Sequence, residues 1–418
     1  MAETRFRLEK GMKAAICCRG GPENGPFSAQ AAKTLRKGLE LNGYEDVLMG
    51  YYAVSGSSPT ALLGCIGEEE KLCRIWRNLT PEDIVGDTDE FKSIGRLLKI
   101  INLIIQDPFN LATWRSLIRE KGKRNDLKLV LRLLENLKHG HIITNGILYE
   151  LLKKHGEPEL ERIFSPQAAL MKISAVDELT GQHVIFSNRV PEHKDLIFRG
   201  IIGSMGLVPQ FPATVIDNPQ GLNLAERTHP DFNKFFLIDG GYKISLPIEA
   251  AIREEIGYDI LFVIDIRNVE LSDISPIDSN ALLSRTLRAL HIRSTTHDQL
   301  VISVQDRINE EIAIRNELEE IRAVLSSLNP SQVGVYGCAS RIKGLIKRMN
   351  DGRLRLYDKH APERVMVSNP KAFNDFDFTK FTGAEVAHLM RAGHNAALKA
   401  LRQLGLSTSG LPLIEPTN

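Results

Sequence analysis

The chain has 418 residues, of which 43% are hydrophobic and 25% are charged, so disorder is not expected and the length suits one large α/β domain or two smaller ones. The 53 lysines and arginines nearly balance the 52 aspartates and glutamates, which argues against a general attraction to nucleic acid. The five cysteines lack the spacing of a disulfide framework, and neither a signal peptide nor a run of ~20 apolar residues is evident. These features predict a cytoplasmic protein, at most peripheral at a membrane surface.

The first predicted elements form a strand-helix-strand unit. A short apolar run over residues 12–18 predicts a buried strand, and a Gly-rich turn follows it. Apolar and small residues at helical spacing then predict a helix over 27–41, and a second strand is expected over 47–55. A unit of ~30 residues of this kind is typical of parallel strands, so the chemistry is expected at the carboxyl ends of the strands.

A long helical pattern then interrupts the strands. Residues 75–162 predict a helical cap inserted into the sheet domain. After the cap, strands are expected over 168–176, 183–187, 235–238 and 260–266, and helices over 298–328 and 382–404. The predicted fold class is therefore α/β.

A serine-rich turn ends the second predicted strand, with the sequence Ala53-Val54-Ser55-Gly56-Ser57-Ser58-Pro59-Thr60. Ser58 stands at its expected apex, with the small Gly56 two positions before it and a proline in the first helical turn after it. Free N–H groups and the helix dipole favour developing negative charge there, so Ser58 is a candidate nucleophile. The alternative is that Ser57 or Ser58 only caps the helix.

Two glycine-containing stretches complete the pattern. Residues 16–25, Ile-Cys-Cys-Arg-Gly-Gly-Pro-Glu-Asn-Gly, form a loop whose backbone N–H groups could bind an anion. Residues 235–242 form an apolar strand that ends in Asp239, Gly240 and Gly241, which puts a carboxylate at a strand's carboxyl end. Each stretch taken alone is also compatible with an ordinary turn.

In this order, the Gly-rich loop, the serine turn and the Asp-Gly-Gly stretch resemble the patatin-like phospholipases. Residues 203–212, Gly-Ser-Met-Gly-Leu-Val-Pro-Gln-Phe-Pro, are similar to a further motif of that family. The resemblance covers about residues 11–405 and implies three α/β/α layers around a mostly parallel central sheet. The implied parts are a sheet core at about 11–75 and 165–300, the cap at about 75–162, a C-terminal helical region at about 298–405 and a tail at 406–418.

The resemblance implies a serine lipid acyl hydrolase that cleaves carboxylic esters of phospholipids or related lipids through an acyl-enzyme, without metal or cofactor. Ser58 takes the place of the nucleophile and Asp239 that of the base, in a Ser/Asp dyad. The implied supporting residues are Gly20 and Gly21 in the oxyanion hole and Gly56, Gly240 and Gly241 in the motifs.

Several positions depart from the family's pattern. Pro22 stands at a glycine of the oxyanion loop and has no N–H to donate. Asn24 replaces an arginine or lysine, and Thr60 and Ser245 replace a glycine and an asparagine. The alternative is therefore a catalytically weak or inactive protein of the same fold that binds lipid or a protein partner.

The sequence offers less support for an α/β-hydrolase site or a metal site. An α/β-hydrolase would need a histidine after the acid, and the histidines of that region follow no convincing strand end. His139 and His141 have no further ligands nearby at metal-binding spacing. Basic residues outnumber acidic ones over 92–138, so the cap could contact anionic lipid headgroups or form a solvated face.

Overall fold

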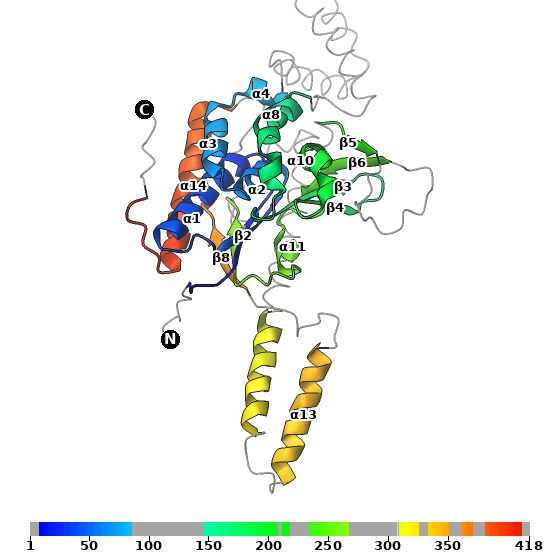
Figure 1. Ribbon diagram of the computed structural model, residues 1–418, viewed down its shortest axis with the longest axis vertical. Coiled ribbons are helices and arrows are strands. Elements are labelled where there is room, and N and C mark those ends of the chain that lie inside the picture. Colours follow the sequence, from blue (N-terminus) through cyan, green and yellow to red (C-terminus); the bar gives the residue numbers. More distant parts are fainter. Residues whose placement is uncertain are drawn as a thin grey trace, which may run out of the picture.

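The computed structural model describes residues 8–85, 146–207, 211–217, 234–266, 307, 309–325, 333–350, 362–370 and 381–411. These residues form an eight-stranded sheet in the order β5-β6-β3-β2-β1-β7-β8, with β4 also paired to β3 (Figure 1). The strands are β1 (Ala14–Cys18), β2 (Leu48–Val54), β3 (Leu170–Asp177), β4 (His183–Ser187), β5 (Thr214–Asp217), β6 (Lys234–Asp239), β7 (Ile260–Ile264) and β8 (Glu363–Val367). Strands β8, β7, β1, β2 and β3 run parallel, whereas β4 and β6 are antiparallel to β3 and β5 is antiparallel to β6.

The helices flank this sheet. They are α1 (Asn24–Leu41), α2 (Ser58–Gly64), α3 (Glu69–Asn78), α4 (Pro81–Val85), α8 (Gly146–Gly156), α9 (Leu160–Ile163), α10 (Ile197–Ser204), α11 (Ile248–Ile252), α13 (Val333–Asn350), α14 (Gly383–Gln403) and a helix over 309–325. Single turns of 3₁₀ helix lie at Ser55–Ser57, Glu157–Glu159 and Gly240–Tyr242, and a longer 3₁₀ helix lies at Pro191–Leu196.

Alternation along the parallel strands separates the core on one face of the sheet from the core on the other. In β1, Ala14, Ile16 and Cys18 join the core that contains α1, α10 and α14, whereas Ala15 and Cys17 join the core beside α11. The same period of two divides β7, because successive side chains of a strand point to opposite faces. Since β1 is buried on both faces, it appears in the sequence as an unbroken apolar run rather than an alternating one.

Helices α1 and α14 pack closely on one face. A Cβ added at Gly38 of α1 would lie 2.2 Å from a methyl carbon of Leu401, and one added at Gly393 of α14 would lie 2.2 Å from the Phe27 carbonyl oxygen. Glycine therefore lets the two helix backbones approach at both points. Thr382 and Glu385 form a capping box at the start of α14, which fixes where this helix begins.

Most predicted elements are confirmed, and so is the predicted fold class, a three-layered α/β architecture with a mostly parallel central sheet. The predicted strand-helix-strand unit is found as β1, α1 and β2, and the four later strands are found as β3, β4, β6 and β7. Strands β5 and β8 were not predicted from the sequence. Most of the predicted cap, residues 86–145, lies outside the described residues.

The five cysteines are free thiols, four of them buried and Cys338 exposed. None of the helices in the described part of the chain is long and apolar enough to cross a membrane.

Candidate active site

Ser55 occupies a strained turn directly after β2. Its φ is 55°, and it is the sole non-glycine residue with positive φ in the described part of the chain. Such backbone conformations cost free energy and gather at functional sites, and a serine presented at a sharp strand-to-helix turn has the geometry of a nucleophile elbow. The Ser55 hydroxyl donates a hydrogen bond of 2.5 Å to Asp239 Oδ2.

The sheet brings Ser55 and Asp239 together from 184 positions apart in the sequence. Strand β4 pairs with β3 over residues 172–176 and so occupies one edge of it. Strands β2 and β6 must therefore share the other edge, where Val54 pairs with Ser174 and Asp239 with the next residue, Ala175. Because β2 runs parallel to β3 and β6 antiparallel, their carboxyl ends meet head to head.

Asp239 is buried, with 5% of its surface exposed. Its second carboxylate oxygen accepts a 2.6 Å hydrogen bond from the Gly241 N–H. Burial raises the pKa of this carboxyl from 3.8 to about 6, against the hydrogen bonds from Ser55 and Gly241, which lower the pKa. The group thus titrates near neutrality, the range in which a general base works well.

Gly240 has no room for a side chain. An added Cβ would lie 2.2 Å from the Ser174 carbonyl oxygen and 2.6 Å from Val54 Cγ2. The glycine after Asp239 is therefore what lets β6 end against β2 and β3.

Ser58, the predicted nucleophile, lies inside the first turn of α2 and is fully buried. Its hydroxyl is 3.1 Å from Ser204 Oγ. Ser204 in turn donates to the Ser174 carbonyl and accepts the Ser55 N–H at 2.8 Å. The structure therefore pairs Asp239 with Ser55 and not with Ser58.

A signal for Ser55 is present in the sequence. Residues 53–57 read Ala-Val-Ser-Gly-Ser, with small residues at both places where the elbow motif G-x-S-x-G has glycine. Aligning the motif on Gly56 directs attention to Ser58, whereas aligning it on Ala53 and Ser57 identifies the serine that has the positive φ.

The Gly-rich loop after β1 lies against this turn. A Cβ added at Gly56 would lie 2.5 Å from the Gly21 carbonyl oxygen, so only glycine at position 56 permits the contact. The Gly20 N–H donates to the Ser245 carbonyl oxygen at 2.9 Å and is therefore already engaged, contrary to its expected use. The N–H groups of Gly21 and Gly56 have no acceptor among the described residues.

Buried polar side chains hold this loop in place. Arg19 and Asp265, both almost fully buried, form an ion pair of 2.8 Å that joins the end of β1 to the end of β7. Asn24 donates to the Gly20 carbonyl at 2.9 Å and accepts the Ile266 N–H at 3.1 Å. Sequence reasoning did not identify Arg19 or Asp265, because their partners are distant in the chain.

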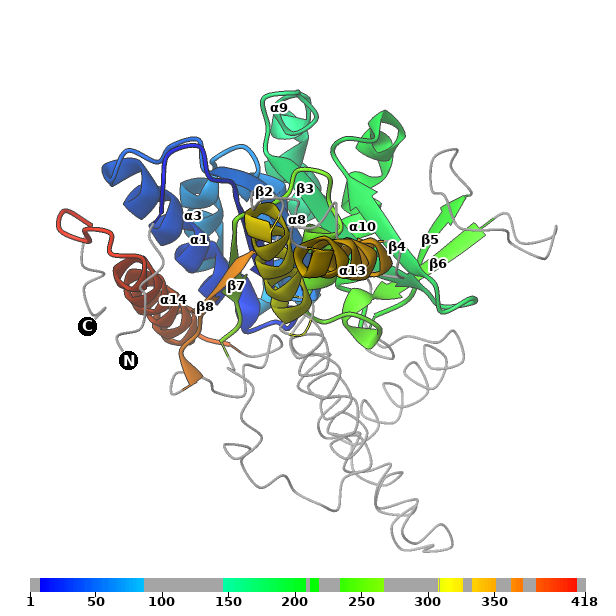
Figure 2. The same cartoon turned by 90° about the horizontal axis from the view of Figure 1, so that it is seen from below.

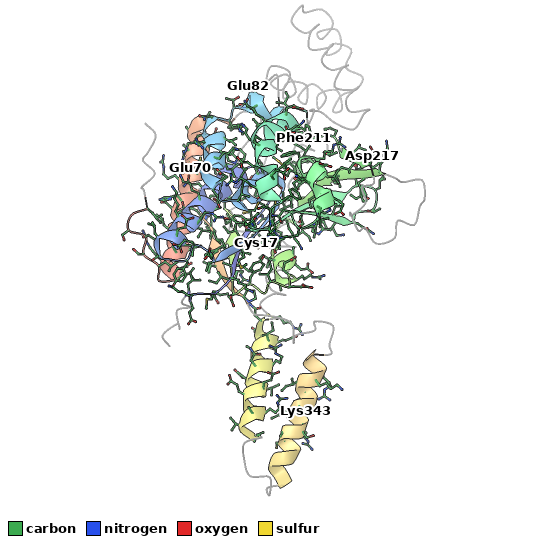
Figure 3. The ribbon with its side chains drawn as sticks, in the orientation of Figure 1. Cys17, Glu70, Glu82, Phe211, Asp217 and Lys343 are labelled. Atoms are coloured by element: carbon green, nitrogen blue, oxygen red, sulfur yellow. The ribbon has the colours of Figure 1, made fainter. Side chains whose placement is uncertain are left out.

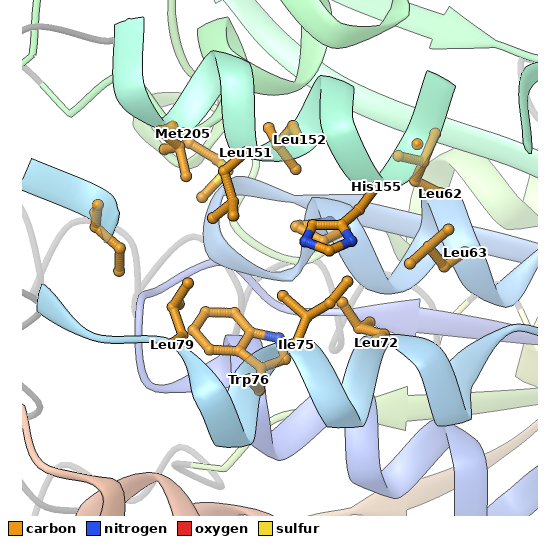
Figure 4. A pocket seen from close by; sticks show the side chains of 14 residues that line it. Leu62, Leu63, Leu72, Ile75, Trp76, Leu79, Leu151, Leu152, His155 and Met205 are labelled. Atoms are coloured by element: carbon orange, nitrogen blue, oxygen red, sulfur yellow. The ribbon is translucent and has the colours of Figure 1, made fainter. Parts of the chain in front are cut away.

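An apolar pocket opens beside the turn (Figure 4). Its lining comes from α2, α3, α4, α8 and Met205, and the side chains labelled in Figure 4 are Leu62, Leu63, Leu72, Ile75, Trp76, Leu79, Leu151, Leu152, His155 and Met205. Pro59 and Met205 in its wall directly follow Ser58 and Ser204, whereas Ser55 and Asp239 do not line the pocket. Apart from His155, every lining residue is apolar.

No group of three or more metal-binding side chains occurs among the described residues. In the same part of the chain, neither Ser55 nor Asp239 has a histidine as a hydrogen-bond partner; His394, for example, contacts Thr34 instead. His139, His141 and the basic residues over 92–138 lie outside the described residues.

Comparisons with known proteins add little. No protein-family model and no curated protein matches the sequence. Among solved structures, the crystal structure of VipD from Legionella pneumophila is similar at 11% sequence identity and a TM-score of 0.29, over 99% of this chain and 96% of that one. At that level of similarity, the site must be interpreted from this chain's own geometry.

Proposed function

We propose that this protein is a serine hydrolase that cleaves carboxylic esters of lipids, with Ser55 as nucleophile and Asp239 as its base. The observation that carries the proposal is the 2.5 Å hydrogen bond between the Ser55 hydroxyl and a buried carboxylate, at a turn with positive φ. The resemblance of three motifs to the patatin-like phospholipases points to the same reaction class, with the nucleophile three residues earlier than Ser58.

In the proposed reaction, Asp239 accepts the Ser55 proton while Ser55 Oγ attacks the carbonyl carbon of the ester. The C–O bond to the alcohol then breaks, and the leaving oxygen takes the proton from Asp239. Water, deprotonated by the same carboxylate, attacks the carbonyl carbon of the acyl-enzyme. The bond from that carbon to Ser55 Oγ then breaks, Oγ takes the proton back from Asp239, and a fatty acid is released. No metal or cofactor takes part.

The oxyanion of the tetrahedral intermediate needs donors. Gly56 N–H follows the nucleophile directly, the position that supplies an oxyanion donor in α/β-hydrolase elbows. Gly21 N–H lies on the loop in contact with Gly56. Since Pro22 has no N–H and that of Gly20 is bound to Ser245, we assign the oxyanion to Gly21 and Gly56 in place of the expected Gly20 and Gly21.

The apolar pocket supports a lipid substrate. Burying methylene groups against leucine, isoleucine and tryptophan side chains favours binding by ~0.8 kcal/mol for each methylene. An acyl chain in this pocket would lie against α2, the helix that follows the turn carrying Ser55. Two further expectations stay predictions: that the basic cap contacts lipid headgroups, and that the protein is cytoplasmic.

The test compares fatty-acid release from mixed phospholipid vesicles and from a short-chain nitrophenyl ester. We expect Ser55→Ala and Asp239→Asn to lose ~10³-fold or more in kcat/KM, and Ser58→Ala to retain most of it, because Ser58 does not contact Asp239. Loss of activity in Ser58→Ala with full activity in Ser55→Ala would restore Ser58 as the nucleophile.

A second candidate, an inactive protein that binds lipid through the same pocket, is favoured by one observation. The Gly20 N–H is held by Ser245, which leaves fewer donors for an oxyanion than the family's motif offers. If folded wild type matches Ser55→Ala at background on every ester but still binds a fatty acid, the binding protein is the better description.

A further inference from the structure

A helical arm extends away from the sheet. It consists of the helix over 309–325 and α13, which run together beyond β8 and α11 (Figures 1 and 2). A hydrogen bond of 3.4 Å from Asn309 to the Pro362 carbonyl lies at its base, next to the start of β8. The arm is remote from Ser55 and is not explained by the proposed hydrolase.

One face of the arm is apolar and half exposed. Ile314, Leu318, Ile321 and Leu325 are spaced by four, three and four residues, which places them on one side of the helix. Ile314 and Ile321 nevertheless remain 52% and 48% exposed, and Val324 beside them is 61% exposed. On α13, Leu345 is 42% exposed. The two helices of the arm thus leave this apolar face, here called the seam, partly exposed to solvent. Such exposure is expected when a helical bundle is incomplete.

The two helices of the arm carry opposite charge. The helix over 309–325 has five glutamates against two arginines, whereas α13 has two arginines, two lysines and no acidic residue. Arg341, Lys343, Lys347 and Arg348 of α13 are all exposed, and none forms an ion pair within the described residues (Lys343 is labelled in Figure 3).

We propose that the arm docks on the arm of a second copy of this chain, with the acidic helix of each copy against the basic helix of the other. A surface that carries one acidic and one basic stripe is complementary to itself under a two-fold rotation, which is the symmetry of most homodimers. The resulting four-helix bundle covers Ile314, Ile321 and Val324 of both copies. An anionic membrane fits less well, because the acidic helix would approach the same surface as α13.

The experiment is sedimentation equilibrium of the full chain over a concentration series. The wild type is expected to dimerise at micromolar concentration and more weakly in 0.5 M salt, because salt screens exposed charges. Ile314→Asp with Ile321→Asp is expected to weaken the dimer at least about tenfold, since it places charge in the seam. Leu179→Asp, a matched change at an exposed leucine of the sheet body, should leave the dimer unchanged.

Charge reversal separates docking from misfolding. Glu317→Lys with Glu320→Lys gives both helices of the arm a net positive charge, and Arg341→Glu with Lys343→Glu and Lys347→Glu gives both a net negative charge. Each variant alone should dimerise at least about tenfold more weakly than wild type, and an equimolar mixture should form the heterodimer. A wild type that stays monomeric at ~100 µM, or a mixture no more associated than its parts, would overturn the proposal. The proposal would also be overturned if the wild type and the arm variants were all monomeric and the variants bound anionic vesicles more weakly than the wild type.

Discussion

Two turns follow the carboxyl ends of the neighbouring parallel strands β1 and β2, and they differ in how their polar groups are bound. The loop after β1, residues 19–25, has its polar groups bound to fixed partners: Arg19 to Asp265, the Gly20 N–H to Ser245, and Asn24 to both Gly20 and Ile266. The turn after β2 holds Ser55 at positive φ with its hydroxyl directed at Asp239.

The difference fits the two roles in the proposed reaction, oxyanion donor for the loop after β1 and nucleophile for the turn after β2. Backbone donors for an oxyanion work best when they do not move, so the first loop benefits from anchors that lie outside it. A nucleophile needs a hydroxyl presented against a base, and the strain of its backbone is maintained by Ser204, which accepts the Ser55 N–H.

The largest effect on stability is expected at the anchor of the first loop. Asp265→Ala leaves the buried Arg19 guanidinium without this carboxylate and should lower the free energy of unfolding by ~3–5 kcal/mol in urea denaturation. Replacing both partners, with Arg19→Met and Asp265→Leu, should recover part of the loss. Glu249→Ala at an exposed ion pair with Arg253 is the control, at ~1 kcal/mol or less. Equal losses of unfolding free energy in Asp265→Ala and Glu249→Ala would mean that the buried ion pair anchors the loop no better than an exposed ion pair would.

The second effect depends on pH and concerns Asp239. Its pKa is raised in the folded state from 3.8 to about 6, so the ionised carboxylate destabilises the fold, with no penalty below pH 3.8 and the full penalty above pH 6. Asp239→Asn should therefore stabilise the protein by up to ~3 kcal/mol at pH 8 and by little at pH 4. Urea denaturation at both pH values checks this, and a gain independent of pH would refute it.

In the proposed reaction, the same titration governs activity. A base must be ionised to accept the Ser55 proton, so hydrolysis should rise through about pH 6 and fall about tenfold for each unit below it. The initial rate of nitrophenyl ester hydrolysis between pH 4.5 and 8 measures this profile. A flat profile across that range would mean that Asp239 is not the base.

The third effect tests how the turn is held. Ser204→Ala removes the acceptor of the Ser55 N–H and should cost ~1–3 kcal/mol of stability, because it leaves a buried donor unpaired. As a positioning change, it should lower kcat with little change in KM. Ser409→Ala, at an exposed serine near the end of the described chain, is the control and should stay within ~0.5 kcal/mol of wild type. An unchanged kcat in Ser204→Ala would show that the turn keeps its shape without this bond.

The smallest effect is expected at Ser58. Ser58→Ala removes a hydroxyl that contacts only Ser204 among the described residues and should cost ~0.5–1.5 kcal/mol, with activity largely kept. Thermal unfolding and ester hydrolysis, measured beside Ser55→Ala, would check both parts. This pair of variants is the direct comparison of two serines in one turn.

The local pattern of the sequence was enough for much of the fold. Strand β1 is an unbroken apolar run, α1 has helical spacing, and β2 ends in a serine-rich turn, so the parallel unit could be predicted. Asp239 was identified because a carboxylate and two glycines end an apolar strand and, together with the other two stretches, resemble a family motif. Apolar residues recur every 2 residues on one face of a strand and every 3.6 residues on one face of a helix. This spacing is a local property, so it can be seen in a single sequence.

The tertiary structure decided which groups meet. Ser55 and Ser58 have similar surroundings in the sequence, and only the head-to-head ends of β2 and β6 along one edge of β3 bring Asp239 to Ser55. Asp265 and Ser245, which hold the first loop, lie more than 220 positions after it in the chain. Such contacts depend on strand order and register, which are set by packing over the whole sheet, and no short stretch of sequence encodes them.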